Sequence, residues 1–325
     1  MRWGIISTGT IAKKFAETIN KMQGEAVLAG VASRSLEKAR DFATFHGAAA
    51  YYSSYEELVQ SSDIDIVYIA TPNVFHYENT LLCLNAGKHV LCEKPFTTNA
   101  SDAKKLYAMA REKGLFIMDG LWTMHLPMYA KIRQLISEGA IGEVKHVRAD
   151  FGFVATGARK DMKLDSSLGG GALLDIGVYN IGFAAMVFGA NPTSIQAHLN
   201  INEYGTDDFG TVILTYPGNR TATLTSAIGI QMPTEGVIYG TKGRLHLPSY
   251  LHAQRMNLYA VGSEEPVIFE LPFDINGFEY QIREAMRCIK GSLKESSQLT
   301  EAFSIGIIQT LDDIRKMAGL RFSFE

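Results

Sequence analysis

The chain has 325 residues, more than one hydrophobic core usually supports, so we expect two domains. Its 31 Lys and Arg residues against 34 Asp and Glu residues give a net charge of −3 without a long block of one sign, which argues against nucleic acid or an anionic membrane surface as a partner. No uninterrupted apolar stretch approaches the roughly 18 residues of a membrane-spanning helix. We therefore expect no nucleic acid and no membrane among the partners.

Three cysteines, Cys83, Cys92 and Cys288, are widely spaced and form no metal-ligand pattern. Buried thiols of this kind indicate a reducing compartment, and the first residues show no export signal. We expect a cytoplasmic protein without a metal site.

Residues 1–121 alternate short apolar runs with stretches of helical periodicity. The runs lie at residues 3–6, 26–32, 66–70, 90–92 and 115–118, and helices are predicted over residues 11–22, 35–46, 75–86 and 100–113. Alternation of this kind predicts a parallel sheet with helices on both faces. Residues 1–121 are therefore predicted to form a doubly wound α/β domain of the nucleotide-binding type.

Residues 122–325 have a different pattern, in which longer strand-like segments predominate. Strands are predicted over residues 144–153, 194–202, 209–216, 221–229, 236–239 and 255–261, and helices over residues 126–138, 179–188, 278–290 and 300–317. Turn sequences between the strands indicate hairpins. The second domain is therefore predicted to be α+β, with one large, mostly antiparallel open sheet.

A turn that contains glycine follows the first predicted strand. Ser7-Thr8-Gly9-Thr10-Ile11-Ala12 opens a helix, where backbone N–H groups and the positive helix end bind a dinucleotide pyrophosphate. Ser7 and Ala12 stand where the first and last glycines of the usual pattern are expected. Ser7 to Ile11 are predicted to bind the cofactor; an ordinary strand-to-helix turn is the alternative.

The second predicted strand ends in Ser33-Arg34, about twenty residues beyond this turn. An acidic residue there would accept hydrogen bonds from a ribose 2′-hydroxyl and repel a 2′-phosphate, whereas a small hydroxyl followed by a guanidinium favours the phosphate. Ser33 and Arg34 therefore predict NADP, with NAD less favoured. Alternatively, Arg34 is a solvated residue at the start of a helix.

Two further strand ends carry candidate residues. Thr71, Pro72, Asn73 and His76 follow the third predicted strand, where the carboxyl ends of parallel strands face a bound dinucleotide. Alternatively, Asn73 caps the following helix and His76 is a half-buried residue of its first turn.

Glu93-Lys94-Pro95 ends the next predicted strand. Hydride transfer between nicotinamide and a carbinol carbon needs a cation or an acid at the oxygen, because charge develops there. Lys94 is predicted to fill that role, and Glu93 and Lys94 to contact the cofactor. An exposed Lys–Glu pair is the alternative.

The second domain contains Gly169-Gly170-Gly171, followed by Asp175 and Tyr179. The glycines permit a close backbone approach to a ligand, and residues four apart share one face of a helix. A neighbouring ammonium favours ionisation of a phenol, so Lys94, Asp175 and Tyr179 are predicted to form a proton-handling cluster. Alternatively, Asp175 caps a helix and Tyr179 belongs to the core.

Together these motifs resemble the Gfo/Idh/MocA oxidoreductase family, and the resemblance extends over both domains. The chain is most similar to the branch of dimeric dihydrodiol dehydrogenases and NADP-dependent sugar dehydrogenases. This similarity is carried by Arg2-Trp3-Gly4-Ile5, Ser54 to Leu58, Val90 to Pro95, Trp122-Thr123, Gly169 to Tyr179 and Asp207-Asp208. One departure is Met124-His125-Leu126-Pro127, where that branch usually has Arg and aromatic residues before the proline.

The resemblance implies a Rossmann domain and a second domain whose open sheet often forms a dimer interface. It implies that Lys94 lies beside the nicotinamide, with a cis bond before Pro95, and that Asp175 and Tyr179 line the substrate pocket. Trp122 is assigned to the cofactor site on the same basis. A homodimer or higher homo-oligomer is expected.

The sequence thus predicts an NADP-dependent oxidoreductase that moves a hydride between nicotinamide and a carbinol or carbonyl carbon. The expected substrate is a small polyhydroxylated or dicarbonyl compound, such as a sugar, a cyclic diol or a hydroxycarbonyl compound. A non-catalytic NAD(P)- or sugar-sensing regulator with the same fold is the alternative; the retention of Lys94, Asp175 and Tyr179 favours the enzyme.

Overall fold

The computed structural model describes residues 1–322 and 324–325, and the chain divides into two compact units. Unit 1 contains Met1–Thr97, Ser101–Trp122 and Asp274–Glu301, and unit 2 contains Thr98–Ala100, Thr123–Phe273 and Ala302–Glu325. This grouping differs from the predicted division after residue 121 chiefly in one respect. Asp274–Glu301 returns from late in the chain and packs with unit 1, which sequence separation gave no reason to expect.

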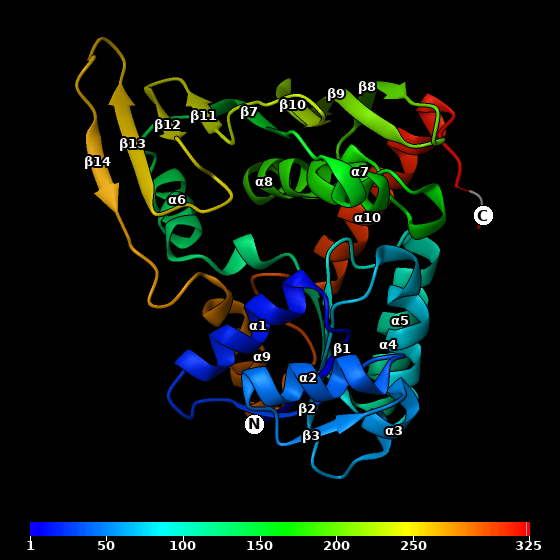
Figure 1. Cartoon of the computed structure of the whole chain (residues 1–325). Helices are drawn as coiled ribbons and strands as arrows, with labels where there is room; N and C mark the ends of the chain where they lie inside the picture. Colours follow the sequence, from blue (N-terminus) through cyan, green and yellow to red (C-terminus); the bar gives the residue numbers. More distant parts are fainter. Residues whose placement is uncertain (323) are drawn as a thin grey trace. The chain divides into compact units, whose positions relative to one another are not determined.

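Unit 1 is built on a six-stranded sheet in which all strands are parallel (Figure 1). Its strands are β1 (Arg2–Ile6), β2 (Val27–Ala32), β3 (Ala50–Tyr52), β4 (Ile66–Ile69), β5 (His89–Glu93) and β6 (Ile117–Gly120). Their order is β3-β2-β1-β4-β5-β6. The predicted doubly wound sheet is confirmed. Because the strand order reverses between β1 and β4, the carboxyl ends of these strands open a crevice of the kind that binds dinucleotides.

Helices cover both faces of this sheet (Figure 1). They are α1 (Thr10–Lys21), α2 (Leu36–His46), α3 (Tyr55–Gln60), α4 (His76–Asn85), α5 (Ala100–Lys113) and α9 (Phe278–Lys290), with the 3-10 turn η1 (Asn73–Phe75) before α4. Helix α1 contacts both α2 and α9, and α3 contacts α4 on the opposite face. Strand β3 and helix α3 were not predicted, because both are too short to show a hydrophobic period.

The core of unit 1 reaches directly to the carboxyl edge of the sheet. Trp3 and Phe15 are fully buried, and the ring of Phe15 stacks on Tyr68 with centroids 3.7 Å apart. Burial of each such side chain contributes about 1.5–3 kcal/mol. The hydroxyl of Tyr68 donates a hydrogen bond to Glu93, so the core fixes a carboxylate at the end of β5.

Unit 2 contains an eight-stranded sheet in the order β14-β13-β12-β11-β7-β10-β9-β8. The strands are β7 (Val144–Phe153), β8 (Ser194–Ile201), β9 (Asp207–Tyr216), β10 (Arg220–Ile228), β11 (Gly236–Gly240), β12 (Gly243–Leu247), β13 (Arg255–Ala260) and β14 (Val267–Glu270). The paired strands are antiparallel except for β7 and β10. The predicted large, mostly antiparallel sheet is confirmed, although β12 and β14 were not predicted.

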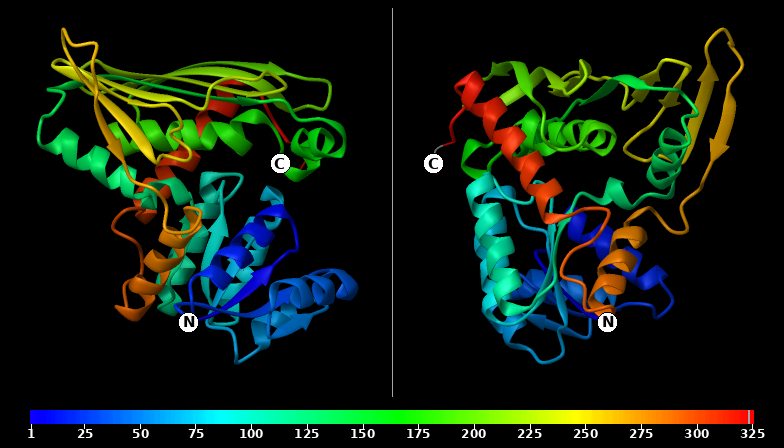
Figure 2. Two further views of the ribbon diagram at one scale, coloured as in Figure 1. Left: turned by 60° about the vertical axis from the view of Figure 1, so that its left-hand side comes forward. Right: turned by 180° about the vertical axis from the view of Figure 1, so that it is seen from behind.

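The helices of unit 2 lie on one face of this sheet (Figure 2). They are α6 (Pro127–Ser137), α7 (Gly157–Lys163), α8 (Val178–Phe188) and α10 (Glu301–Ala318), together with the 3-10 turns η2 (Trp122–His125) and η3 (Ser166–Leu168) and the π-helical turn η4 (Leu173–Gly177). Ser166–Phe188 is apolar enough in composition to cross a membrane, with a mean hydropathy of 1.6, but 78% of its most apolar window is buried inside the protein. This segment, which ends in α8, belongs to the core of unit 2. Helix α7 was not predicted from the sequence.

Candidate functional site

The predicted cofactor residues share one edge of the unit 1 sheet. They follow β1 (Ser7, Thr8, Gly9, Thr10, Ile11), β2 (Ser33, Arg34), β4 (Thr71, Pro72, Asn73, His76), β5 (Glu93, Lys94) and β6 (Trp122). The strands are parallel, so these residues leave the sheet on the same side. The fold therefore assembles residues that lie far apart in the sequence along one crevice.

The turn after β1 leaves the start of α1 open. Ser7 has a φ of 100°, the left-handed conformation that the expected glycine would adopt without strain, and its hydroxyl accepts the Gly9 N–H at 3.2 Å. Gly9 is the N-cap of α1, no side chain caps this helix, and its first turn contains no acidic residue.

The neighbouring helices show the opposite arrangement. Ser35 caps α2 and Ser54 caps α3, each through its side chain, and both helices have acidic residues in the first turn. The N–H groups at the start of α1 thus keep their capacity to bind an anion, as a pyrophosphate requires. These residues fit a dinucleotide.

Arg34 extends from the end of β2 as an exposed side chain. Burial raises the pKa of the Tyr55 phenol, and the nearby Arg34 guanidinium opposes that rise. No ion pair of Arg34 is found among the described residues. Ser33 is 8% exposed, and its hydroxyl accepts the Ser35 N–H at 3.3 Å. The end of β2 therefore offers a cation beside a hydroxyl and a phenol.

His76 joins two strand ends. Its Nδ1 lies 2.8 Å from the Pro95 carbonyl oxygen, and its Nε2 lies 2.9 Å from the Thr71 carbonyl oxygen. The ring is fully buried, which lowers its pKa, so His76 is a buried rather than a half-buried residue of the first turn of α4. Both ring nitrogens face main-chain carbonyls, and His76 therefore fixes the loop after β4 against the turn after β5.

The other loop residues are placed by the same turn. Asn79 donates to the Thr71 hydroxyl at 3.1 Å, so the Thr71 side chain is held as well as its carbonyl. Asn73 is the first residue of η1, and Pro72 is the N-cap of that turn, so Asn73 is not the cap that was considered as its alternative role.

Glu93 and Lys94 lie at the end of β5, before a cis Lys94–Pro95 bond, as the family resemblance implied. Glu93 is only 5% exposed, which excludes the alternative of an exposed ion pair. Burial raises the pKa of Glu93, while the Tyr68 hydroxyl and the ammonium groups of Lys94 and Lys14 oppose the rise. The turn thus combines a half-buried lysine with a buried carboxylate.

Lys14 is a site residue that the sequence analysis missed. Its ammonium lies 5.0 Å from the ring centroid of Trp122 and 4.3 Å from that of Phe278. In the sequence, Lys13-Lys14 is a pair of equivalent charges on an amphipathic helix. Only the packing of α1 against α9 shows that Lys14 faces inward.

In unit 2, Asp175 lies in η4 and Tyr179 in the first turn of α8. The π-helical turn η4 leads directly into α8, and such turns are frequent at functional sites. That Asp175 and Tyr179 share one face stays a prediction. The Asp175 carboxylate pairs with the Lys163 ammonium at 2.5 Å. Lys163, on the unpredicted helix α7, is a second residue that the sequence analysis missed.

Tyr179 belongs to a group of tyrosines with Tyr129 and Tyr250. Burial raises the pKa of both partners, and the electrostatic influence of Tyr179 adds to each rise. Tyr179 is 8% exposed, and Phe151 lies beside it with ring centroids 6.5 Å apart. The phenol of Tyr179 is thus held in a wall of aromatic side chains.

The glycine run has an internal packing role. A Cβ atom on Gly170 would lie 2.5 Å from the Lys163 carbonyl oxygen, and one on Gly171 would lie 2.4 Å from an oxygen of Asp207. Gly171 also has a φ of 115°. The close approach predicted for a ligand is therefore made by the protein's own chain.

Asp175 is not an N-cap residue, because the N-caps of η4 and α8 are Ala172 and Gly177. Asp207 instead binds the start of η4. Its carboxylate accepts the Leu173 N–H at 2.7 Å, at the start of η4. The adjacent Thr206 hydroxyl donates to the Leu164 carbonyl at 3.0 Å, just after α7. The start of β9 therefore anchors both segments that carry the Lys163–Asp175 pair.

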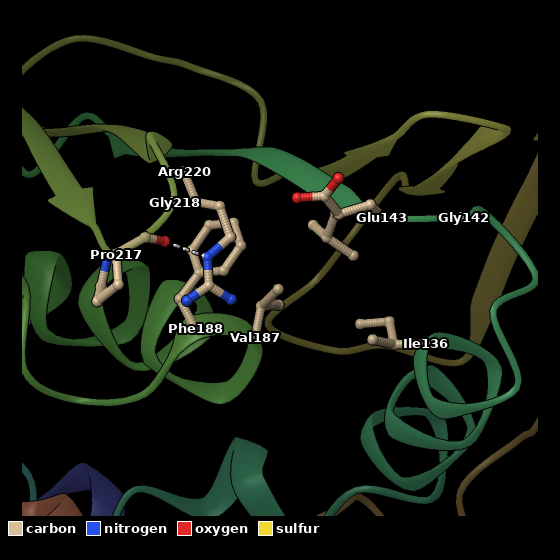
Figure 3. Close-up of a pocket in the computed structure, with 9 residues that line it drawn as sticks. Ile136, Gly142, Glu143, Val187, Phe188, Pro217, Gly218 and Arg220 are labelled. Carbon is tan, nitrogen blue, oxygen red and sulfur yellow. Dashed lines mark hydrogen bonds between the residues drawn. The ribbon is translucent and has the colours of Figure 1, made fainter.

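Unit 2 also has a cavity of about 400 Å³ below its sheet (Figure 3). Arg220 lies against the ring of Phe188 and donates to the Pro217 carbonyl at 2.7 Å, and Ile136 and Val187 supply apolar walls. Among the described residues that line this cavity, none was predicted to belong to the cofactor or substrate site. We assign it no role in the chemistry.

The predicted cluster of Lys94 with Asp175 and Tyr179 joins residues of both units and stays a prediction. Within unit 1, a doubly wound sheet, an open helix N-terminus and a lysine at a strand end define a dinucleotide-dependent oxidoreductase.

Comparison with known proteins is consistent with this class. The profile described as "Oxidoreductase family, NAD-binding Rossmann fold" matches residues 1–121, and that of the GFO/IDH/MocA C-terminal domain matches residues 129–246. Trans-1,2-dihydrobenzene-1,2-diol dehydrogenase of Xenopus laevis is 36% identical over 332 residues, covering 99% of each chain. The human enzyme of that name is 33% identical over 329 residues, covering 99% of this chain and 98% of the relative.

Solved structures agree over nearly the whole chain. A 3-ketoreductase from Actinomadura kijaniata in complex with NADP and TDP-benzene is 28% identical, with a TM-score of 0.87 and coverage of 97% of both chains. An aldose-aldose oxidoreductase from Caulobacter crescentus complexed with glycerol is 26% identical, with a TM-score of 0.88 and coverage of 98% of this chain and 97% of that one. The chain belongs to the Gfo/Idh/MocA family, and it is an NAD(P)-dependent oxidoreductase that acts on CH–OH groups.

Proposed function

We propose that the protein is an NADP-dependent dehydrogenase or reductase acting on a sugar, a cyclic diol or a hydroxycarbonyl compound. The observation that carries this proposal is the N-terminus of α1, after Ser7, which no side chain caps. Helices α2 and α3 are both capped by side chains, whereas the first backbone N–H groups of α1 remain available to bind an anion. The turn from Ser7 to Ile11 binds the pyrophosphate through these amides.

Arg34 directs the preference toward NADP. It is a cation without a protein counter-ion among the described residues, and it follows β2 beside Ser33. A guanidinium and a hydroxyl there bind a 2′-phosphate. NAD has no 2′-phosphate to offer this guanidinium and binds less well.

The bound cofactor supplies or accepts the hydride at its nicotinamide ring. Lys94 places its ammonium at the substrate oxygen, where charge develops, and Glu93 accepts hydrogen bonds from the cofactor. Tyr179 exchanges a proton with that oxygen, and Asp175, paired with Lys163, orients the substrate hydroxyl groups.

The relatives support the substrate class. They include enzymes named for a dihydrodiol, a 3-keto group and aldoses, and one is complexed with glycerol. Small polyhydroxylated or dicarbonyl compounds are therefore the substrates to test.

The test is turnover: NADP reduction is measured with pentoses, hexoses and cyclic diols, and NADPH oxidation with the corresponding carbonyl compounds. Wild type should turn over at least one of them, and a Lys94→Ala variant should bind NADP but lose about 10² or more in rate. Activity in the variant equal to wild type would contradict the role of Lys94. No turnover by wild type with any of these substrates would count against the substrate class.

We further propose self-association through the bare face of the unit 2 sheet. The helices of this unit cover only the opposite face (Figure 2), and Ile213 on β9 is 38% exposed. An Ile213→Arg substitution should convert a homodimer to a monomer in sedimentation analysis. A wild-type monomer at micromolar concentration would refute this part of the proposal.

We also propose that the protein works in the cytoplasm. All three cysteines are free and buried, as suits a reducing compartment. Cell fractionation tests this, and recovery outside the cytoplasmic fraction would contradict it.

A further inference from the structure

Two adjacent residues at the start of β9 hold two separate segments of unit 2. Thr206 precedes the strand and Asp207 begins it, and both residues are fully buried. The Thr206 hydroxyl donates to the Leu164 carbonyl at 3.0 Å, and the Asp207 carboxylate accepts the Leu173 N–H at 2.7 Å. One strand end therefore binds the chain just after α7 and the chain at the start of η4.

The two segments carry the partners of one ion pair. Lys163 directly precedes Leu164, and Asp175 lies two residues after Leu173. The Lys163 ammonium lies 2.5 Å from the Asp175 carboxylate, and the two side chains are only 20% and 17% exposed. Because both partners are largely buried, the relative position of their segments sets the direction of the Asp175 carboxylate.

Main-chain hydrogen bonds join the same segments through the glycine run. The Gly171 N–H donates to the Lys163 carbonyl at 2.8 Å, and the Asp175 N–H donates to the Gly171 carbonyl at 3.0 Å. A Cβ atom on Gly171 would overlap a carboxylate oxygen of Asp207. The absence of a side chain at Gly171 therefore lets Asp207 come close enough to bind the Leu173 N–H.

The turn before β9 fixes the Thr206 side chain. The Asn202 N–H donates to the Thr206 carbonyl at 2.8 Å, and the Asn202 side-chain amide donates to the Thr206 hydroxyl at 3.2 Å. The hydroxyl thus accepts one hydrogen bond while it donates another to Leu164. A hydroxyl with partners on both sides is held in one direction.

We propose that Thr206 and Asp207 are positioning residues of the substrate site, which hold the Lys163 and Asp175 segments so that the Asp175 carboxylate is directed toward substrate hydroxyl groups. This role rests on the proposed function, in which Asp175 orients the substrate. A group that orients a substrate must be held to within about 0.5 Å by residues around it. Thr206 and Asp207 are fully buried, so they act through Asp175 and do not touch the substrate.

A purely stabilising role would have a different consequence. Loss of a hydrogen bond would then lower the free energy of unfolding, but the folded enzyme would keep its affinity for substrate. A change in KM that depends on the presence of Asp175 separates the two roles.

The experiment compares Thr206→Val with Thr223→Val. The first substitution keeps the shape of the side chain and removes the hydroxyl that binds Leu164. The second removes a hydroxyl from β10, where Thr223 alternates with buried neighbours and so lies on the opposite face of the sheet from the core. Thr206→Ser restores the hydroxyl. Asp207→Ala removes the acceptor for the Leu173 N–H, and Asp207→Asn retains one.

Each variant is made in wild type and in an Asp175→Ala background. Steady-state kinetics with a substrate found in the turnover screen give KM and kcat, and calorimetry gives the affinity for NADP. A thermal unfolding scan establishes that each variant is folded.

Thr206→Val and Asp207→Ala should each raise KM about five- to tenfold, as the loss of one hydrogen bond implies, with a smaller change in kcat. The affinity for NADP should stay the same, because the predicted cofactor residues lie in unit 1. Thr206→Ser and Asp207→Asn should restore most of the affinity for substrate, and Thr223→Val should resemble wild type. In the Asp175→Ala background, Thr206→Val and Asp207→Ala should raise KM less than about twofold, because the group that they position is absent.

An equal rise in KM with and without Asp175 would overturn the proposal, because the effect would then not pass through Asp175. An unchanged KM in folded Thr206→Val would also overturn it, and this variant decides the question if Asp207→Ala does not fold. An unchanged KM in Asp175→Ala alone would instead contradict the proposed role of Asp175. Absence of turnover by wild type with every substrate would overturn the proposed function, and this role with it.

Discussion

Asp207 and Leu173 are joined by a buried hydrogen bond of 2.7 Å, in which the Leu173 N–H donates to the Asp207 carboxylate. The other carboxylate oxygen of Asp207 has no hydrogen-bond partner among the described residues, and it faces Gly171. The Asp207 carboxyl group therefore holds the turn that carries Asp175, and it is buried away from solvent.

This burial predicts a pH dependence of stability. It raises the pKa of Asp207 to about 7, from an ordinary value of about 3.9. Because the folded-state pKa is raised, the contribution to stability is fully present below about pH 4 and is lost as the pH rises through about 7. Asp207→Asn keeps the shape of the side chain and removes this titration.

The free energy of unfolding of wild type should therefore fall between about pH 4 and 7, relative to the variant, by roughly a few kcal/mol, since one pKa unit corresponds to about 1.4 kcal/mol. Urea unfolding at several pH values across this range measures the free energy of unfolding of both proteins. Asp208→Asn is the control, because the Asp208 side chain instead accepts a hydrogen bond from Asn200 at 2.8 Å. Parallel pH profiles for wild type and Asp207→Asn would contradict the prediction.

Arg34→Ala should weaken NADP binding by roughly 10- to 100-fold and leave NAD binding nearly unchanged, because only NADP carries the 2′-phosphate. Calorimetry measures the dissociation constants of both cofactors, and the change in each on substitution shows whether the loss is specific to NADP. Arg40, also an exposed arginine but inside α2, provides the matched control as Arg40→Ala. Equal losses for NADP and NAD would exclude the 2′-phosphate role.

Tyr179→Phe should lower the rate of the catalysed step by about 10² or more while cofactor binding is retained, because the ring stays and only the proton-exchanging hydroxyl is lost. Single-turnover kinetics with a substrate found in the screen measure that step. A near-normal rate would leave the proton transfer to Lys94 or to water.

Gly170→Ala should destabilise the protein by about 1–3 kcal/mol, because the new methyl group would overlap the Lys163 carbonyl oxygen. Thermal or urea unfolding measures the loss. Gly157→Ala is the comparison, since no atom lies within 4 Å of a Cβ there, although its φ of 55° brings some backbone strain. An equally stable Gly170→Ala variant would show that the backbone relaxes.

Much of the fold could be predicted from the sequence because hydrophobic periodicity is a local property. The helices over Ala100–Lys113 and Phe278–Lys290 and the strand Val144–Phe153 coincide with their predicted bounds. The short elements β3, α3 and α7 were missed, since three to seven residues are too few to establish a period.

The candidate site could be predicted only in part, for the same physical reason. Glycine turns and polar residues at strand ends are local signals, so Gly9, Arg34 and Lys94 could be named as candidates from the sequence, and their roles stay predictions. Lys163, Asp207 and Lys14 were missed, because each acquires its role from a partner more than ten positions away.

By itself, the sequence determined where the strands of unit 1 end and which polar residues stand there, because those features depend on neighbours along the chain. Only the tertiary structure decided which charges are buried and paired. The Lys14 ammonium lies over a ring of a helix from late in the chain, the Glu93 carboxylate lies below the surface, and the Asp207 carboxylate accepts the Leu173 N–H of the turn that carries Asp175. Desolvation and charge pairing depend on distances between residues in space, and these distances are set only when the chain folds.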